Sequence, residues 1–337
     1  MDLFALTRQL VDIESITGNE AGVGELLDRS LSLLDYDTQR VPVEENRFNL
    51  FAVPRGNPHP KVVFSTHMDV VPPWTASSED EHNIYGRGSC DAKGIIAAQI
   101  GAAERLRTEN LPIGLLFVVG EERNSVGAFV ANAKAHELHG GSCKFLINGE
   151  PTDNKIAVAS KGGLRVEVTA KGKLAHSAYP HLGDSAIEKL LSALERLRRI
   201  PLPENPEVGP CTMNIGVIEG GHAPNVIADH ARAQLLYRLV GPADELKKQI
   251  VSAAGDQAEV RFTLEIPFLK LRTVDGIPTM TAAFTTDIPA LTNWGEPVLL
   301  GPGSIHVAHT DHEFIAKQEL LHAVELYCRV VKSLLGR

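Results

Sequence analysis

The sequence lacks the features that mark secreted and disulfide-rich proteins. It has only four cysteines in 337 residues, and they are far apart, with no CxxC pair and no N-x-[ST] glycosylation site. Dispersed cysteines of this kind are typical of free thiols in a reducing compartment. Residues 1–11 are acidic at the start and amphipathic, rather than basic and then apolar, so they predict no signal peptide. We therefore expect a cytoplasmic protein.

Long apolar runs and an excess of positive charge are also missing. The longest strictly apolar runs are short, such as 115–119, whereas a spanning helix needs about 20 residues. The 33 basic and 42 acidic side chains give a formal charge of −9. This balance argues against nucleic acid and against an anionic membrane surface as partners, because both favour basic proteins.

The composition is that of a globular protein, with 43% hydrophobic and 22% charged residues, and the length suits two domains. The first half alternates strand and helix patterns. Strands are predicted at 48–53, 62–65, 114–119 and 144–147, and helices at 3–13, 23–34, 93–107 and 126–138. This alternation predicts an α/β fold, with a mostly parallel sheet and helices on both faces.

The pattern changes near residue 161, where the order of predicted elements becomes β-α-β-β-α-β. The elements are 164–170, 187–197, 212–218, 231–239, 244–254 and 259–264. This order is that of a ferredoxin-like α+β unit. After residue 273 the α/β pattern resumes and ends in a predicted helix at 314–335. We therefore predict a larger domain formed by 1–161 and 268–337, split by an inserted domain at 162–267.

Several acids and histidines follow predicted strands of the larger domain. His67 and Asp69 come after the strand at 62–65, and two residues apart on an extended chain they share a face. Asp91 ends a glycine-rich turn before a helix, where open α/β proteins bind ligands. Each signal has a structural alternative, since an HxD pair is common by chance and a glycine-rich turn can be an anion site.

Further carboxylates follow the next strands. Glu121 and Glu122 come after 114–119 and Glu150 after 144–147. Adjacent acids are unfavourable at a buried strand end without a cation, although a helix start is a serious alternative. The segment 301–313 adds three histidines, His306, His309 and His312, of which at least one is expected to be an ordinary surface residue.

Taken together, these signals are specific, because the ends of parallel strands meet at one edge of a sheet. Two histidines and five acids suit two divalent ions such as zinc, with one bridging carboxylate and one carboxylate left as a base. Paired metals form a recognised hydrolytic site. The residues in this inventory are His67, Asp69, Asp91, Glu121, Glu122, Glu150 and His309.

Five motifs in this order, over nearly the whole chain, resemble the M20 metallopeptidase family, in particular the acetylornithine deacetylase and succinyl-diaminopimelate desuccinylase relatives. The resemblance implies a catalytic domain with two divalent ions, zinc or else cobalt, and an inserted lid and dimerisation domain. It also implies a cis peptide after Asp91. The implied metal ligands are His67, Asp91 (bridging), Glu150, Glu122 and His309; Glu121 is the implied general base, and Asp69 orients the site behind His67.

The resemblance also implies residues that contact the substrate. His176 matches a lid histidine that in dimeric relatives reaches the partner's site and binds the scissile carbonyl oxygen. Asn225 matches the family's asparagine loop, and Arg238 matches an arginine that grips a substrate carboxylate, although a solvated strand-end arginine is an equal alternative. Gly303 and Ser304 are assigned to substrate binding on the same resemblance. His222, near Asn225, is expected to be structural.

The resemblance thus implies a homodimeric metal-dependent hydrolase that cleaves the amide bond of a small N-acyl amino acid, in the manner of an acetylornithine deacetylase of amino-acid biosynthesis. Glu121 would take a proton from water and pass it to the leaving amine. The alternatives are an M20 dipeptidase or carboxypeptidase acting on a short peptide, a succinyl-diaminopimelate desuccinylase, and a noncatalytic homologue that binds metal or peptide. The inserted domain with His176 argues against an aminopeptidase of a related di-zinc fold.

Overall fold

The computed structural model describes residues 2–337, which form two compact units. The first unit comprises residues 2–158, Leu271–Met280 and Thr286–Arg337, and the second comprises Ala159–Lys270 and Thr281–Thr285. The second unit is therefore an insertion into the first, as the sequence pattern predicts. Across residues 2–337, no helix is both long enough and apolar enough to cross a membrane.

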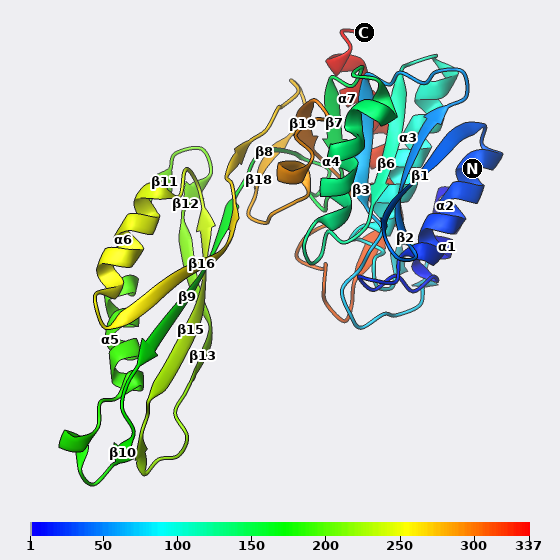
Figure 1. Cartoon of the computed structure of the whole chain (residues 1–337). Coiled ribbons are helices and arrows are strands. Elements are labelled where there is room, and N and C mark those ends of the chain that lie inside the picture. Colours follow the sequence, from blue (N-terminus) through cyan, green and yellow to red (C-terminus); the bar gives the residue numbers. More distant parts are fainter. Residues whose placement is uncertain (1) are drawn as a thin grey trace. The chain divides into compact units, whose positions relative to one another are not determined.

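A six-stranded sheet forms the centre of the first unit (Figure 1). Its order is β1 (Tyr36–Glu44), β2 (Arg47–Pro54), β6 (Ile113–Val118), β3 (Val62–His67), β7 (Phe145–Asn148) and β19 (Glu296–Leu299). The four strands from β6 to β19 are parallel, and β1 and β2 are antiparallel additions at one edge. Every residue of β3 and β6 is buried, as expected for strands covered on both faces. The predicted mostly parallel sheet is confirmed.

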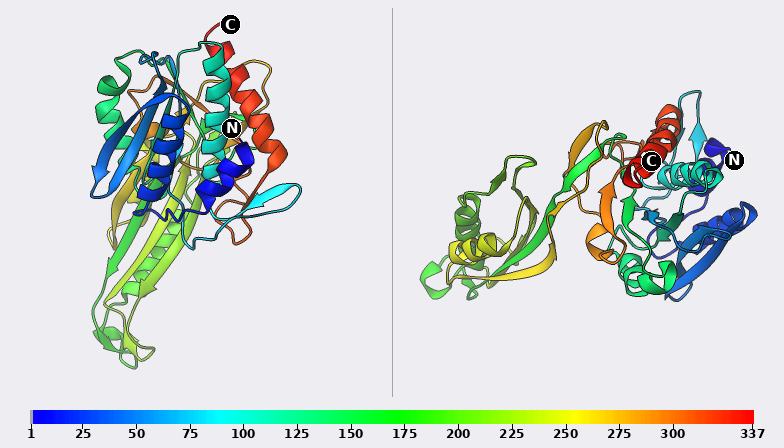
Figure 2. Two further views of the ribbon diagram at one scale, coloured as in Figure 1. Left: turned by 90° about the vertical axis from the view of Figure 1, so that its right-hand side faces the viewer. Right: turned by 90° about the horizontal axis from the view of Figure 1, so that it is seen from above.

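Helices cover both faces of this sheet, because successive side chains of a strand point to opposite sides. Val62 and Phe64 of β3 join one apolar cluster, and Val63 between them joins another. The first cluster packs under α1 (Leu3–Val11), α2 (Ala21–Leu33), α3 (Lys93–Thr108) and α7 (Lys317–Leu334). The second packs under α4 (Val126–His139) and the 3-10 helix η2 (Ile288–Ala290). Figure 2 shows α3 and α7 on one side of the sheet and α4 on the other.

Two segments of this unit differ from the sequence prediction. β1 was not predicted, because Pro42 and several polar residues interrupt its pattern; an edge strand tolerates both. The predicted helix at 314–335 is wrong in its first turn, since Phe314–Ala316 forms β20. This strand pairs with β5 (Asn83–Tyr85), which in turn pairs with β4 (Ser78–Glu79). Tertiary pairing here overrides the helical pattern of the sequence.

The inserted unit is a four-stranded antiparallel sheet with two helices on one face. The sheet order is β13 (Thr212–Gly220), β15 (His230–Leu239), β9 (Gly162–Lys171) and β16 (Ala258–Ile266), and the helices are α5 (Ala186–Arg198) and α6 (Asp244–Ala254). The predicted β-α-β-β-α-β order is confirmed. Smaller elements of the unit are β10 (Ala175–His176), η1 (Pro180–Leu182), β11 (Glu204–Asn205), β12 (Gly209–Pro210) and β14 (Val226–Ile227).

Three short strands lie where the chain passes between the units. They are β17 (Leu269–Lys270), β8 (Ile156–Ser160) and β18 (Thr279–Ala282), in that sheet order. The glycine and proline residues at 162, 163 and 267 predict boundaries at 161/162 and 267/268, and the units separate at 158/159 and 270/271.

Candidate metal centre

The residues predicted to carry chemistry gather at the carboxyl ends of three neighbouring parallel strands. His67 is the last residue of β3, Glu121 and Glu122 follow β6, and Glu150 follows β7. Asp91 lies in the turn before α3. The location is the edge at which open α/β sheets bind ligands. The peptide bond between Asp91 and Ala92 is cis.

The side chains form two clusters that share Asp91. The first contains His67, Asp91 and Glu150, and the second contains Asp91, Glu122 and His309; in each, one ligand atom per residue lies within 4.8 Å of the others. Asp91 Oδ1 is 3.0 Å from His67 Nε2, and Asp91 Oδ2 is 3.4 Å from His309 Nε2. The two oxygens of one carboxylate therefore face two different clusters, which is the arrangement of a bridging ligand.

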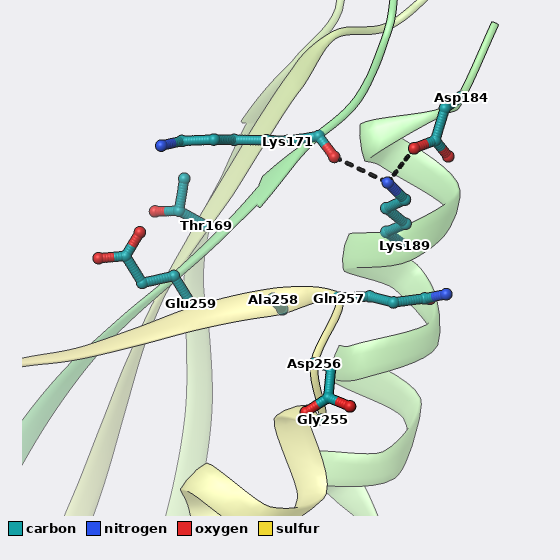
Figure 3. Close-up of a pocket in the computed structure, with 9 residues that line it drawn as sticks. All are labelled: Thr169, Lys171, Asp184, Lys189, Gly255, Asp256, Gln257, Ala258 and Glu259. Atoms are coloured by element: carbon teal, nitrogen blue, oxygen red, sulfur yellow. Dashed lines mark hydrogen bonds and ion pairs between the residues drawn. The ribbon is translucent and has the colours of Figure 1, made fainter.

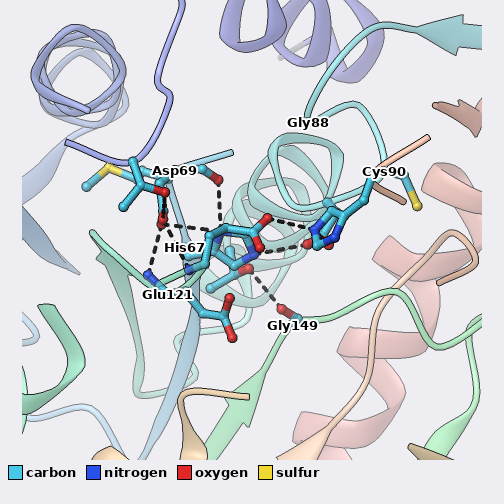
Figure 4. Close-up of polar contacts among 12 residues, drawn as sticks. His67, Asp69, Gly88, Cys90, Glu121 and Gly149 are labelled. Atoms are coloured by element: carbon cyan, nitrogen blue, oxygen red, sulfur yellow. Dashed lines mark hydrogen bonds and ion pairs between the residues drawn. The ribbon is translucent and has the colours of Figure 1, made fainter. Parts of the chain in front are cut away.

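The hydrogen bonding of His67 leaves its second nitrogen facing carboxylates (Figure 4). His67 Nδ1 lies 2.9 Å from the carbonyl oxygen of Asp69, which can only accept a hydrogen bond, so Nδ1 carries the proton. Nε2 then turns a lone pair toward Asp91 at 3.0 Å. Two acceptors face each other in this way only if a proton or a cation lies between them. Metal-bound histidines commonly donate their other ring N–H to an oxygen in this manner.

Asp69 holds the loop that carries the paired glutamates. Its Oδ1 accepts hydrogen bonds from the backbone N–H groups of Gly120 (3.0 Å) and Glu121 (3.1 Å). Its Oδ2 accepts from the N–H of Glu122 (3.2 Å) and from the hydroxyl of Thr17 (2.9 Å). The carboxylate of Asp69 thereby fixes the turn after β6, while the backbone carbonyl of the same residue orients His67. Sequence reasoning did not identify Thr17, which stands far from every motif.

The carboxylates of the centre repel one another. Burial, and then the charge of Glu150, raise the pKa of Glu121 well above its usual value. Burial and the charge of Asp91 do the same to the pKa of Glu150. Burial also raises the pKa of Asp287, at the start of η2, to about 6. Such shifts mark a site that is short of positive charge.

An unpaired atom supports the same interpretation. Glu150 is 4% exposed, and its Oε1 has no hydrogen-bond partner among the described residues. A buried carboxylate oxygen without a partner costs free energy unless a cation contacts it. The donor set of imidazole and carboxylate suits zinc and similar divalent ions. The residues present therefore fit a dinuclear metal centre.

The histidines respond to the same excess of negative charge. Burial alone would lower the pKa of His67, but its contacts with Asp69 and Asp91 raise it well above its usual value. Contacts with Asp91 and then Glu122 raise the pKa of His309 to about 10. Burial raises and both histidines lower the pKa of Asp91, and the lowering prevails. In the metal-free chain, protons therefore occupy positions that suit cations.

Glu313 fixes the turn that carries Asp91, and the sequence analysis assigned it no role. Its Oε1 accepts from the backbone N–H groups of Gly88, Cys90 and Asp91, at 2.9, 3.1 and 3.0 Å. Its Oε2 is 2.6 Å from Arg87 Nη1, and both side chains are about 2–3% exposed. Glu313 thus determines the conformation of the backbone around the bridging carboxylate. Its sequence signal is only a single acid after the histidines.

The segment 301–313 contributes one histidine to the clusters. His309, with φ of +65°, places Nε2 2.9 Å from Glu122 Oε1, whereas His306 and His312 belong to neither cluster. Gly303 lies against Cys90 so closely that an added Cβ would come within 2.5 Å of its Sγ. The carbonyl of Ser304 accepts a weak hydrogen bond from the same thiol. Both residues therefore contact Cys90, in the turn that carries Asp91.

Comparisons with known proteins agree with this geometry. Residues 158–261 match the model of the M20 peptidase dimerisation domain. The chain is 38% identical to a "probable carboxypeptidase" of Aspergillus terreus over 97% of its own length and 85% of the relative's. The chain belongs to the M20 peptidase family. It is accordingly a metallopeptidase-type hydrolase.

Solved M20-like structures share the complete fold. A tripeptidase of Staphylococcus aureus superposes with a TM-score of 0.83 and 23% identity, covering 99% of this chain and 98% of that one. An M20 family metallo-carboxypeptidase of Sulfolobus solfataricus superposes with a TM-score of 0.77 and 16% identity, covering 99% of both chains. These similarities establish the α/β catalytic domain with an inserted dimerisation domain.

Membership of the M20 family refines the predicted function. The relatives are peptidases and carboxypeptidases, so the comparisons favour the predicted alternative over the main prediction. They do not support a deacetylase or a place in amino-acid biosynthesis.

The residues predicted on the inserted domain fall into two groups. His176 pairs with Val226 across β10 and β14, and Ser177 N donates to the carbonyl of Asn225 at 3.0 Å, so His176 and Asn225 lie together. Arg238 lies near the end of β15, eight residues from His230 at its start and about 26 Å along the strand. The domain thus separates the predicted carboxylate-binding arginine from the predicted lid residues.

Arg238 has no side-chain hydrogen bond or ion pair among the described residues. It is half-buried, and burial lowers the pKa of its guanidinium. A partly desolvated guanidinium without a carboxylate is a favourable place for one. The two forked donors of arginine match the two oxygens of a carboxylate.

The inserted domain also carries an open polar hollow of about 480 Å³ (Figure 3). Two lysines and three acids are among the residues that line it. Lys189 Nζ already donates to the carbonyl of Lys171 (2.9 Å) and to Asp184. The positive side chains are therefore offset by neighbouring acids, and the hollow offers no free excess of positive charge. None of the predicted site residues contributes to it.

Proposed function

We propose that the protein is a dinuclear metal-dependent carboxypeptidase or dipeptidase that acts on short peptides with a free C-terminal carboxylate. The observation that carries the proposal is the pair of clusters that share Asp91, with the additional carboxylate of Glu121 beside them. The similarity to probable carboxypeptidases supports peptides as the substrate class.

In this proposal, His67, Asp91 and Glu150 hold one divalent ion, and Asp91, Glu122 and His309 hold the other. Zinc is the preferred assignment, because two histidines with carboxylates suit it, and cobalt is the closest substitute. Ions bound there supply Lewis acidity toward a water molecule and the scissile carbonyl. The remaining chemistry belongs to side chains of the chain itself.

Glu121 is the proposed general base. It takes a proton from the attacking water, whose oxygen forms the new C–O bond, and it delivers a proton to the amine nitrogen as the C–N bond breaks. Burial and Glu150 raise the pKa of Glu121, which favours the proton-carrying form needed for the second transfer. Asp69 keeps Glu121 in place through the hydrogen bond at 3.1 Å to its backbone N–H.

Two residues of the inserted domain complete the proposal. Arg238 binds the C-terminal carboxylate of the substrate, as its unpaired and half-buried guanidinium favours. His176 donates a hydrogen bond to the scissile carbonyl oxygen in the partner's site of a homodimer, beside Asn225. The M20 dimerisation domain supports the homodimer, and the resemblance to M20 enzymes supports the role of His176.

The test is an activity panel on the zinc-loaded and cobalt-loaded protein. We expect hydrolysis of dipeptides and N-blocked dipeptides, and little hydrolysis of the same peptides with an amidated C-terminus. N-acetylornithine and N-succinyl-diaminopimelate are included, because preferred turnover of either would replace the peptidase proposal with a deacylase. A metal-loaded protein inactive on the whole panel would indicate a noncatalytic homologue.

Arg238→Met should raise KM for free-carboxylate peptides by ~10–100-fold, since a charge-assisted bidentate contact is lost. Arg198→Met is the matched control, because Arg198 is an exposed arginine on α5 of the same domain. Equal KM values for both variants would remove Arg238 from the substrate site.

A further inference from the structure

A second group of metal-ligand side chains lies in the inserted domain, separate from the residues assigned to the candidate metal centre. It consists of His222, Asp229 and His230, which we call the hairpin cluster, since it joins the ends of β13 and β15. One ligand atom from each residue lies within 4.8 Å of the others. His222 Nε2 is 3.0 Å and His230 Nδ1 is 2.8 Å from the same atom, Asp229 Oδ1.

The backbone holds these three side chains in position. Gly221 N donates to the carbonyl of His230 at 3.2 Å, which brings the backbone beside His222 against the first residue of β15. Gly172 N donates to the carbonyl of Asp229 at 2.7 Å. Gly221 has φ of +75°, a conformation that glycine adopts without strain. The cluster is therefore preorganised by main-chain contacts that do not depend on the side chains themselves.

The contacts resemble those at the candidate metal centre. There, His67 Nε2 is 3.0 Å from Asp91 Oδ1, and His309 Nε2 is 2.9 Å from Glu122 Oε1. In the hairpin cluster, the two imidazoles contact carboxylate oxygen at similar distances, but both converge on one atom, Asp229 Oδ1. Hydrogen bonds from His230 and then His222 lower the pKa of Asp229, so this carboxylate stays ionised under ordinary conditions.

Hydrogen bonds among these side chains contribute little stability. The side chains of His222 and His230 are 49% and 58% exposed, and that of Asp229 is 36% exposed. Solvent-exposed pairs of this kind contribute about 0–1 kcal/mol, because water competes with each contact. Two imidazoles and one carboxylate, with open positions for water, match the preferences of zinc, cobalt, nickel and copper ions.

We propose that the hairpin cluster binds one divalent transition-metal ion through His222 Nε2, His230 Nδ1 and the carboxylate of Asp229, with water completing its coordination. The ion would tie the end of β13 to the start of β15, at the base of the loop that carries Asn225. The expectation that His222 is structural is compatible with this site, because a metal there would stabilise the loop. The inference does not depend on the proposed function, since the two sets of ligands share no residue.

The test counts ions on the full-length protein. After equilibrium dialysis against buffered Zn²⁺, we expect wild type to retain one more ion per chain than His222→Ala, His230→Ala and Asp229→Asn. His181→Ala is the matched control, because His181 is an exposed histidine of the same domain outside every cluster. The difference between wild type and variant is informative whatever number of ions the other centre holds.

A spectroscopic measurement identifies the ligands independently. Cu²⁺ added to zinc-loaded protein should give an electron paramagnetic resonance signal coupled to two imidazole nitrogens in wild type and His181→Ala, and to one in His222→Ala or His230→Gln. Equal ion counts in wild type and all cluster variants, or an unchanged nitrogen coupling, would overturn the proposal. Peptidase activity is a separate readout, so its absence would contradict the proposed function and leave the ion count valid.

Discussion

The molecule contains two groups of histidines and carboxylates that have similar contact distances and different exposure. At the candidate metal centre the side chain of His67 is 1% exposed, and its Nε2 lies 3.0 Å from Asp91. In the hairpin cluster the side chain of His222 is 49% exposed, and its Nε2 also lies 3.0 Å from a carboxylate, that of Asp229. Contact distance therefore does not separate the two groups. What separates them is the burial of His67, Asp91 and Glu150, since His309 is 47% exposed and thus as open as His222.

The difference shows what burial adds to a set of ligands. At the buried centre, the pKa values of Glu121, Glu150 and Asp287 are all raised, because water cannot stabilise neighbouring charges there. In the hairpin cluster, the pKa of Asp229 is lowered by its histidines. At the buried centre, a cation is accordingly needed to compensate the negative charge of the carboxylates. In the exposed hairpin cluster, the charge is already compensated by water and histidines, and a cation is not needed for this purpose. We expect tight binding and chemistry at the first, and weaker, structural binding at the second.

The largest effect is expected from Glu121→Gln. Removing the proposed base should lower kcat by ~10²–10⁴-fold, the usual contribution of general acid–base catalysis. The content of bound metal should stay unchanged, because Glu121 is not among the residues of the two clusters. Glu137→Gln, on an exposed position of α4, is the control and should keep wild-type kcat. A Glu121→Gln enzyme that retains most of its turnover would remove this residue as the base.

The second effect concerns the turn that carries Asp91. Glu313→Ala leaves Arg87 buried without its partner and leaves three backbone N–H groups without an acceptor. We expect a loss of about 3–5 kcal/mol in the free energy of unfolding, measured by urea denaturation of the metal-free protein.

The control for this prediction is an exposed ion pair of the same unit. Glu109→Gln breaks the contact between Glu109 and Lys332, whose side chains are 48% and 39% exposed respectively. We expect this substitution to lower the free energy of unfolding by about 0–1 kcal/mol. If the two variants are equally stable, the buried network around Glu313 does not hold the Asp91 turn.

The residues of the metal centre and of its surroundings show how much of the site can be predicted from the sequence. Strand ends carrying acids and histidines pointed to one edge of a parallel sheet, and the clusters indeed form there. Glu313 and Asp287 had no comparable signal, since each is a single acid outside any pattern and acquires its role only from tertiary contacts. β1 and β20 were missed for a similar reason, because their partner strands, and not their own periodicity, determine them.

A smaller effect is expected on the pH dependence of stability of the metal-free protein. The pKa of His309 is raised from 6.5 to about 10 in the metal-free chain, so this histidine binds its proton more tightly when folded. Its contribution to stability is complete below about pH 6.5 and is lost as the pH rises through about 10. Asp287, whose pKa is raised from 3.8 to about 6, acts with the same sign at lower pH.

We therefore expect the Tm of the metal-free protein to fall between pH 6.5 and pH 10. The metal-loaded protein should change less, because a cation replaces the proton. The gap in Tm between the two forms should widen with pH, as measured by scanning calorimetry. A gap that is constant or narrows would show that protons and metal do not compete at this centre. His309→Ala should also flatten the pH dependence of the metal-free form.

We infer that two metal ions share Asp91, with His67 beside one of its carboxylate oxygens and His309 beside the other. The most direct measurement is the number of zinc ions per chain in His309→Ala and in His306→Ala, determined by mass spectrometry of dialysed protein. We expect His309→Ala to bind one ion fewer than wild type and His306→Ala to bind the same number. An unchanged count in His309→Ala, or a lost ion in His306→Ala, would contradict it.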